Sequence, residues 1–460
     1  MLKEILLNLP EVAGPKEKKL GFKEKLKWTC IVLLLFFIMG SIPLFGLGEN
    51  VLSTFEMLSV ILGAKFGSII SLGIGPLVTA SIVLQLLNGS GLVKFDLTTT
   101  DGKKMFQGVQ KVLSIFFIIF EAFVFVLMGG LSPQAGISPL LIIFQLMLGG
   151  ILIMFMDEVV SKWGFGSGIS LFIAAGVSEE LVVRLISPFT SAGTLYTVAG
   201  QASQAPAGAL LAILYFLPQG DVQAVLLSIA AIASTLFVFA IAVYAQSMKV
   251  EIPLSFGRIR GHGIRWPLSF IYTSNIPVIL VAALMANINL WARLLETSGH
   301  PLLGTFVGNT PASGLVLWIT PHNVIGELLR GSLQLSQLKY SLGYVLFMVV
   351  GCIIFSIFWV QTSGMDARSQ AERMMSSGLQ IPGFRRDQRV LEQILNRYIM
   401  PLTVMGAVAV GVLAALADLS GALTSGTGLL LTVMIVYRLY EDIAHQHAMD
   451  MSPMLRRFIQ

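Results

Sequence analysis

Apolar runs of about twenty residues recur along the whole 460-residue chain, and they constrain the fold more than any other feature. A helix needs about 20 mostly apolar residues to cross the roughly 30 Å hydrocarbon core of a bilayer. Only 12% of the residues are charged and the mean hydropathy is +0.81, whereas roughly a quarter of the residues in a soluble domain are charged. The sequence therefore predicts an all-α polytopic membrane protein.

Ten segments meet this requirement to different degrees. Nine are clear, and they cover residues 28–42, 109–131, 137–156, 169–186, 222–244, 267–290, 342–360, 398–417 and 419–440. The second of the ten, 47–87, is interrupted by Gly67, Gly73, Gly75 and Pro76, which leaves two pieces that are each too short to span. Irregular backbone at membrane depth persists only where protein buries it or water wets it. The interruption predicts an internal cavity, with a re-entrant hairpin that only packs as the alternative.

The distribution of lysine and arginine predicts the orientation, because positive residues favour the cytoplasmic side of a membrane. With a cytosolic N-terminus, 25 of the 30 basic residues fall in cytosolic segments. Seven lysines and four glutamates precede the first apolar segment, and no small-residue cleavage site follows it. We therefore interpret 28–42 as a retained helix rather than a signal peptide, and we expect both termini in the cytosol.

The ten segments divide into two halves of five around a central pore. We predict a cytosolic amphipathic N-terminus (1–27), a first half (28–187), an external loop (188–221), a second half (222–440) and a cytosolic tail (441–460). An odd number of helices per half inverts the second half, so a two-fold axis in the membrane plane is expected. Pro76 and Pro277 interrupt the second and seventh segments, and glycines begin the fifth and recur in the tenth, as matching positions of a repeat would.

Two predicted cytosolic loops, 247–266 and 362–397, carry clustered arginines. The first contains Arg258 and Arg260, and the second contains Arg385 and Arg386. Positive-inside topology and attraction to anionic lipid head groups explain such clusters. A loop of about 35 residues is longer than topology requires, and arginine-rich projections also suit an RNA or an acidic protein partner.

Glu121 is the only carboxylate near the middle of an apolar segment, where an ionisable group is costly and marks a candidate functional site. Thr79 and Asn275 are plausible hydrogen-bond partners. A secondary transporter would use Glu121 as its coupling carboxylate, since inverted repeats and broken helices are also marks of transporters. A single polar contact between helices is the other interpretation.

Catalytic motifs are absent from the sequence. All five histidines lie in loops or in the C-terminal tail, and there is no HExxH, GxSxG or P-loop. Cys30 and Cys352 lie inside apolar runs, and we interpret both as small buried hydrophobic residues. We expect no enzyme activity, no metal and no cofactor.

The stretch 72–80, Leu-Gly-Ile-Gly-Pro-Leu-Val-Thr-Ala, with Gln-Leu-Leu at 85–87, resembles the second helix of the SecY family, the pore-forming subunit of the Sec protein translocase. Further similar stretches follow in order at 22–26, 157–176, 250–253, 274–280, 383–385, 401–405 and 426–440. They look more like the archaeal and eukaryotic branch than the bacterial one. No resemblance covers 188–220 or 297–337.

The resemblance implies a passive protein-conducting channel that moves unfolded secretory polypeptides across a membrane and releases apolar segments sideways into lipid. It implies a pore constriction at six aliphatic residues, Ile74, Val78, Ile169, Ile173, Ile279 and Leu431. It implies a plug over 53–67, with Ser53, Phe55, Glu56, Leu58, Leu62 and Gly67 among its residues. It implies a lateral gate that contains Thr79, Glu121 and Asn275.

Partners and location follow from the same resemblance. It implies ribosome docking at Arg258, Arg260, Arg385 and Arg386. It also implies small single-helix subunits of the SecE type and of a beta type, together with signal sequences, nascent polypeptides and membrane lipids. The cell membrane is the expected location, and the endoplasmic reticulum is the alternative. The competing hypothesis remains a secondary transporter with Glu121 as its coupling carboxylate.

Overall fold

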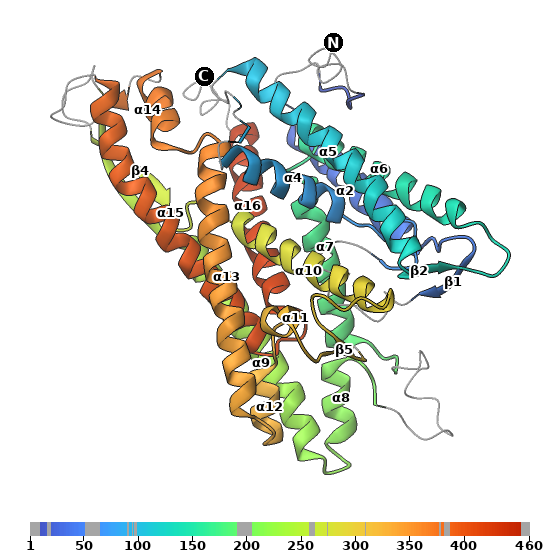
Figure 1. Cartoon of the computed structure of the whole chain (residues 1–460). Helices are drawn as coiled ribbons and strands as arrows, with labels where there is room; N and C mark the ends of the chain where they lie inside the picture. Colours follow the sequence, from blue (N-terminus) through green and yellow to red (C-terminus); the bar gives the residue numbers. More distant parts are fainter. Residues whose placement is uncertain are drawn as a thin grey trace.

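Ten helices of at least 15 residues make up most of the described chain (Figure 1). The computed structural model describes residues 10–15, 20–50, 65–89, 92–93, 95, 99–190, 205–256, 263–273, 275–308, 310–376, 379–380 and 387–451. The ten helices are α2 (Phe22–Ser41), α4 (Gly75–Gly89), α5 (Thr100–Leu127), α6 (Pro139–Trp163), α7 (Gly168–Ile186), α9 (Val222–Ser247), α10 (Ile276–Thr297), α13 (Leu335–Thr362), α15 (Gln388–Leu419) and α16 (Gly426–Met451). Each overlaps one predicted segment, so the all-α prediction is confirmed.

Large apolar side chains cover the outside of the bundle as well as its inside. Six of the described helices, α5, α6, α9, α10, α13 and α15, are each long and apolar enough to cross a membrane. Leu34, Phe144, Leu236 and Leu346 all present more than half of their surface to the surroundings. A soluble monomer rarely exposes a contiguous apolar patch larger than a few hundred Å². The chain is therefore a multi-pass membrane protein whose outer face is solvated by lipid.

The helices form two groups of five that share one core. The first group runs from α2 to α7 and the second from α9 to α16. Helix α4 of the first group contacts α10 and α13 of the second, and α7 contacts α16. The largest hydrophobic cluster takes buried side chains from nine of the ten helices, α5 being the one without a residue in it. Contacts between the groups thus bury the same side chains that hold each group together.

The interruption before α4 is an ordered turn buried by protein. Gly67 and Gly73 have positive φ angles of 95° and 56°, which a side-chain-bearing residue rarely adopts. The carbonyl of Gly67 accepts from the N–H of Leu44 at 2.8 Å, and the N–H of Ile69 donates to the carbonyl of Ile42 at 3.0 Å. Ile70 is fully buried. The turn after α2 therefore supplies the hydrogen bonds that the broken helix lacks.

Shorter elements connect the ten helices. They are β1 (Leu47–Asn50), β2 (Leu131–Pro133), α8 (Ala209–Phe216), β3 (Lys249–Phe256), β4 (Gly263–Ser269), β5 (Phe306–Val307), β6 (Thr310–Pro311), α11 (Leu315–Ile319), α12 (Val324–Arg330), α14 (Ala367–Ser376) and β7 (Leu379–Gln380). Strand β1 pairs with β2, β5 pairs with β6, and the third sheet has the order β4-β3-β7, all antiparallel. The long connections at 188–221 and 298–334 therefore contain helices, which the sequence did not predict.

The predicted start of the seventh segment was wrong. Residues 263–269 form β4, in which Leu268 pairs with Val250, and α10 begins only at Ile276. Pro277 occupies the first turn of α10, where its missing N–H costs nothing. A proline also cannot donate to the carbonyl four residues before it, and its ring clashes with that carbonyl, so a helix does not continue backwards through Pro277.

Several other helix boundaries differ from the prediction, among them those of α5, α6, α13, α15 and α16. The ninth helix, α15, starts ten residues before the predicted 398, so part of the basic loop 362–397 is helical. The tenth helix, α16, starts at Gly426 rather than at 419, because Gly421 turns the chain with φ 65° after α15 ends. Cys352 is buried as expected, whereas Cys30 is exposed on α2.

Gly149 on α6 allows the interrupted turn to approach the helix, and replacing it tests this contact. A Cβ at this position would lie 1.9 Å from the carbonyl oxygen of Ile69, a backbone atom that cannot rotate away. We expect Gly149→Ala to destabilise the protein by about 1–3 kcal/mol, the usual cost of overpacking, and to lower Tm in a thermal scan in detergent. The control is Gly21→Ala, where nothing lies within 4 Å. An unchanged Tm for Gly149→Ala would contradict the contact.

Candidate functional site

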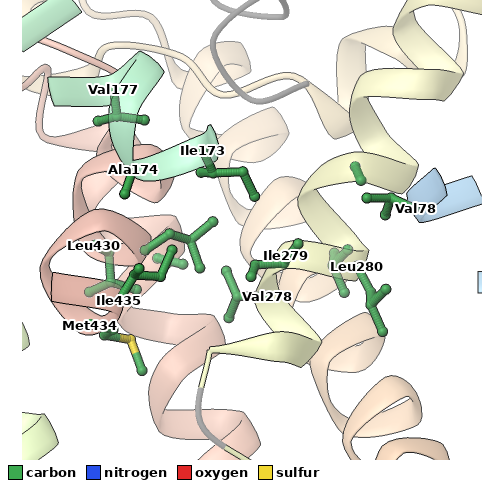
Figure 2. Packing of buried hydrophobic residues seen from close by; sticks show 14 of the residues in the cluster. Val78, Ile173, Ala174, Val177, Val278, Ile279, Leu280, Leu430, Met434 and Ile435 are labelled. Atoms are coloured by element: carbon green, nitrogen blue, oxygen red, sulfur yellow. The ribbon is translucent and has the colours of Figure 1, made fainter. Parts of the chain in front are cut away.

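Aliphatic side chains from four helices converge at the centre of the molecule. Figure 2 shows side chains from these helices gathered in one cluster, among them Val78 of α4, Ile173 of α7, Ile279 of α10 and Leu430 of α16. All of these side chains belong to the largest hydrophobic cluster. The centre therefore has no charged side chain among its converging residues.

The six predicted constriction residues meet in this cluster. Ile74, Val78, Ile173, Ile279 and Leu431 are members of it, and each is at most 7% exposed. Ile169 is partly buried and packs against the same cluster. They come from the turn before α4 and from α4, α7, α10 and α16, which are distant in the sequence. Their assignment to a pore constriction remains a prediction.

A cavity of about 670 Å³ adjoins the aliphatic centre. Val78, Ile169 and Ile279 line it where it meets the cluster, and the start of α5 contributes Gln107 and Gln110. Other lining side chains carry both signs of charge: Lys103, Asp157, Arg438 and Asp442. A space of this size with several polar partners can hold water. A cavity is therefore present beside α4, with charged and amide side chains in a mostly apolar lining, whereas the interrupted residues 67–76 are not among its lining residues.

Three helices exchange hydrogen bonds beside the aliphatic centre. The hydroxyl of Thr79 on α4 lies 2.8 Å from the carbonyl oxygen of Gly75 and 3.3 Å from Oε1 of Glu121 on α5. The amide of Asn287 on α10 donates to the Thr79 hydroxyl at 2.9 Å. Glu121 is 5% exposed. The polar group predicted around Glu121 thus joins α4, α5 and α10.

The asparagine bonded to Thr79 is Asn287, and the assignment of Asn275 to the lateral gate remains a prediction. Asn275 precedes α10 and lines the cavity, twelve residues before Asn287 and so about 18 Å away along the helix. Asn287 was missed, although an amide in the middle of an apolar helix is a recognised sign of a hydrogen bond between membrane helices. Trp291, one turn beyond Asn287, stacks on Phe120 of α5 with ring centroids 5.6 Å apart. Helices α5 and α10 are therefore joined by an aromatic contact as well.

The end of the predicted plug is attached to α7 and to the turn after α2. Ser53, Phe55, Glu56, Leu58 and Leu62 lie outside the described residues. Gly67 is described, and two residues before it the ammonium of Lys65 lies 2.7 Å from Oε1 of Glu179 on α7. The hydroxyl of Ser68 donates to the carbonyl of Lys65 at 2.6 Å.

The two basic loops meet in one sheet. Arg258, Arg260, Arg385 and Arg386 lie outside the described residues. The strands that flank them are described: Ser255 of β3 pairs with Gln380 of β7, and Phe256 pairs with Leu379. The β3–β4 hairpin and the segment after α14 are therefore hydrogen-bonded to each other, which sequence periodicity in so short a strand cannot reveal. Within the described residues, no group of three His, Cys, Asp or Glu side chains could hold a metal ion.

Two five-helix groups around a hollow with an aliphatic centre define a membrane protein of the channel or transporter class. The chain belongs to the SecY family: the SecY family model matches residues 68–440, and the model of the plug domain of Sec61p matches residues 34–67. The second match includes the whole predicted plug range. The resemblance stated from the sequence is thereby confirmed.

Relatives and solved structures agree over nearly the full length. The chain is 45% identical over 458 residues to the protein translocase subunit SecY of Methanothermobacter thermautotrophicus, covering 98% of this chain and 96% of the relative. It is 42% identical over 459 residues to that of Methanococcus vannielii, covering 100% and 99%. A solved protein-conducting channel matches with a TM-score of 0.83 and 41% identity, covering 98% and 99%. Sec61 in the canine ribosome-channel complex from the endoplasmic reticulum matches with a TM-score of 0.79 and 40% identity, covering 98% and 99%.

Cysteine labelling tests whether the cavity is wet and the centre dry. In a background with Cys30 and Cys352 replaced by alanine, Gln107→Cys is expected to react with a charged maleimide about ten-fold faster than Ile74→Cys, because a thiol reacts as the hydrated thiolate. Gln107 is exposed and lines the cavity, whereas Ile74 is 1% exposed. Leu34→Cys, 59% exposed on the apolar outside, is the lipid control and should react slowly.

Lipid nanodiscs give the reagent access to both faces, so the result does not depend on orientation. Equal rates at 107 and 74 would mean that the cavity and the aliphatic centre are not distinct environments. Equal rates at 107 and 34 would mean that the cavity is no wetter than the lipid-facing surface.

Proposed function

We propose that this chain is a passive protein-conducting channel that moves unfolded secretory polypeptides across the membrane and releases apolar segments sideways into lipid. The observation that carries the proposal is the meeting of aliphatic side chains from α4, α7, α10 and α16 beside a cavity that charged and amide side chains help to line. A channel for unfolded chains must pass every kind of side chain. Fixed charges at its narrowest point would retain some of them, whereas an aliphatic ring retains none and seals by dewetting.

The lateral gate lies, in this proposal, where α4 meets α10 and α13. Membership of the SecY family and the contacts between α4 and these two helices support that position. Each Leu, Ile, Phe or Val favours the membrane by about 0.3–0.6 kcal/mol, while each Lys, Arg or Asp costs about 2.5–3.5 kcal/mol. A run of about twenty apolar residues therefore leaves sideways, and a hydrophilic stretch continues through the pore.

The plug over 53–67 is proposed to block the pore at rest, and the docking arginines are proposed to receive the ribosome. The sheet that joins the two basic loops supports a single docking surface. The canine relative is described in a ribosome-channel complex. Small single-helix subunits of the SecE and beta types complete the proposed assembly. The chain carries no nucleotide-binding motif, so the driving force comes from a partner.

We place the basic loops and both termini in the cytosol, because this orientation puts most lysines and arginines on the cytoplasmic side. The cell membrane is the proposed location. The archaeal relatives support it, whereas the canine relative of the endoplasmic reticulum represents the alternative.

Photo-crosslinking tests the pore directly. A photoreactive residue at Ile74 or at Ile279 is expected to capture a secretory chain stalled during translocation, because a chain in the pore must touch the ring. The matched control is Leu236, 64% exposed on the outer face of α9. Capture at Leu236 alone, with none at Ile74 or Ile279, would contradict a central path.

Replacing Glu121 separates the channel from a secondary transporter, the alternative that its buried carboxylate favours. Glu121→Gln removes the titratable group and keeps an oxygen that can accept from Thr79. In the channel, secretion is expected to stay within about two-fold of the parent, since the exchange costs at most one hydrogen bond between membrane helices. In a transporter, pH-driven solute uptake into vesicles would be lost. The transporter would be supported if the parent secretes no polypeptide and takes up solute in response to pH, and if Glu121→Gln loses that uptake.

A further inference from the structure

Two aspartates in matching helices of the two halves accept hydrogen bonds from the start of the next helix. Asp157 lies near the end of α6, the fourth helix of the first half, and faces the start of α7. Asp418 lies at the end of α15, the fourth helix of the second half, and faces the start of α16. Neither aspartate belongs to the proposed pore constriction, plug or lateral gate.

The start of α7 is capped by α6 rather than by its own side chains. Ser167 precedes the helix and its side chain makes no capping hydrogen bond. Instead, Oδ1 of Asp157 accepts from the N–H of Ile169 at 3.0 Å, and the N–H of Gly168 also faces this carboxylate. Gly168 permits the approach, since a Cβ there would lie 2.6 Å from the Cα of Asp157.

The start of α16 repeats this arrangement. Oδ1 of Asp418 accepts from the N–H of Thr427 at 2.7 Å, and the hydroxyls of Thr427 and of Tyr344 on α13 both donate to Oδ2. Gly426 permits the approach, since a Cβ there would lie 2.0 Å from the carbonyl carbon of Ala417. The hydroxyl of Ser425 accepts from the N–H of Gly428 at 3.2 Å, so α16 has a second cap.

The two caps lie at opposite ends of the bundle. Ser167, Ile169 and Leu171 line the cavity at the start of α7, whereas Arg438 and Asp442 line it toward the end of α16. Helix α7 therefore begins where α16 passes its last turns. A two-fold axis in the membrane plane relates elements in this way, so the caps are corresponding features of the two halves.

A carboxylate at these places needs a reason, because an ionisable group in a membrane segment is costly. Among the described residues, neither aspartate forms an ion pair. The first N–H groups of a helix have no partner within the helix, and lipid or dry protein offers them none. The partial positive charge of a helix start also favours an anion. Each aspartate supplies these groups with a fixed anionic acceptor, and Asp157 does so at the wall of the cavity.

We propose that Asp157 and Asp418 are twin positioning residues that set where α7 and α16 begin and so hold the aliphatic centre in place. This inference rests on the proposed function. Ile169 is itself the residue whose N–H is held, and Ile173 follows it by four residues. Leu431 follows Thr427 by the same four residues. Four residues are about one helical turn. Each aspartate therefore fixes the backbone one turn before a proposed constriction residue, Ile173 on α7 and Leu431 on α16.

Hydrogen exchange tests the caps on the full-length protein in nanodiscs. Asp157→Ala is expected to speed amide exchange in 168–173 by about 2- to 30-fold, the range that a lost N-cap produces, and to leave 426–431 unchanged. Asp418→Ala is expected to do the reverse. Asp157→Asn and Asp418→Asn keep a capping oxygen and should stay within about two-fold of the parent. Ser167→Ala is the matched control and should change nothing, because its side chain caps nothing.

Ion leak through the same variants in proteoliposomes tests the link to the aliphatic centre. Both alanine variants are expected to leak more than the parent, and both asparagine variants and Ser167→Ala are expected to match it. Faster exchange in the alanine variants without added ion leak would overturn the positioning role. The caps themselves would be overturned if exchange in these variants is unchanged or is raised across the whole chain. They would also be overturned if Ser167→Ala speeds exchange equally.

If Asp157→Ala does not accumulate, Gly168→Ala replaces it, because the added Cβ forces the start of α7 away from Asp157. Unchanged exchange in 169–173 would then overturn the cap.

Failure of the proposed channel function gives a different result. It appears as absent crosslinking at Ile74 and Ile279, whatever the exchange rates of the two helix starts.

Discussion

Every backbone N–H and C=O inside a bilayer must find a partner within the protein, and this constraint explains where the chain is regular and where it is not. A continuous helix satisfies the constraint without help. The interrupted segment before α4 satisfies it through the turn after α2, by the hydrogen bonds of Leu44 and Ile69. The irregular backbone before α4 is therefore covered by a neighbouring element, and Ile70 and Ile74 within it belong to the aliphatic cluster.

The interior cannot differ from the exterior by apolarity alone, because lipid is as apolar as a leucine side chain. What distinguishes the interior here is close approach and polar pairing. A Cβ on Gly406 of α15 would lie 2.7 Å from the carbonyl oxygen of Phe270, so that helix lies directly against backbone. The buried hydroxyls of Thr273 and Ser356 are 2.9 Å apart and join the approach to α10 with α13. Close packing and hydrogen bonds thus do what the hydrophobic effect does in a soluble core.

Much of this architecture could be predicted from the sequence, for a physical reason. The length of an apolar run is set by membrane thickness, so the existence of ten helices follows from counting residues. Their starts do not follow as easily, because β4 is as apolar around Leu268 as a helix would be, and only its pairing with β3 identifies it. Asn287 was missed for a related reason. Which of two asparagines reaches Thr79 depends on how α10 lies against α4, and residue spacing within one helix carries no information about the neighbouring helix.

The contact between α4 and α10 is well suited to open. Separating two membrane helices exposes apolar side chains to lipid, and this exchange has almost no hydrophobic cost. The remaining cost is in polar contacts, and each hydrogen bond between membrane helices contributes only about 0.6 kcal/mol, at most about 1.7. Thr79 is bonded to Asn287 and adjoins Glu121, so a few such contacts hold α4 to its neighbours. An apolar segment that inserts between α4 and α10 replaces the lost packing with its own side chains. In the proposed channel the segment to be released therefore lowers the cost of the opening through which it leaves.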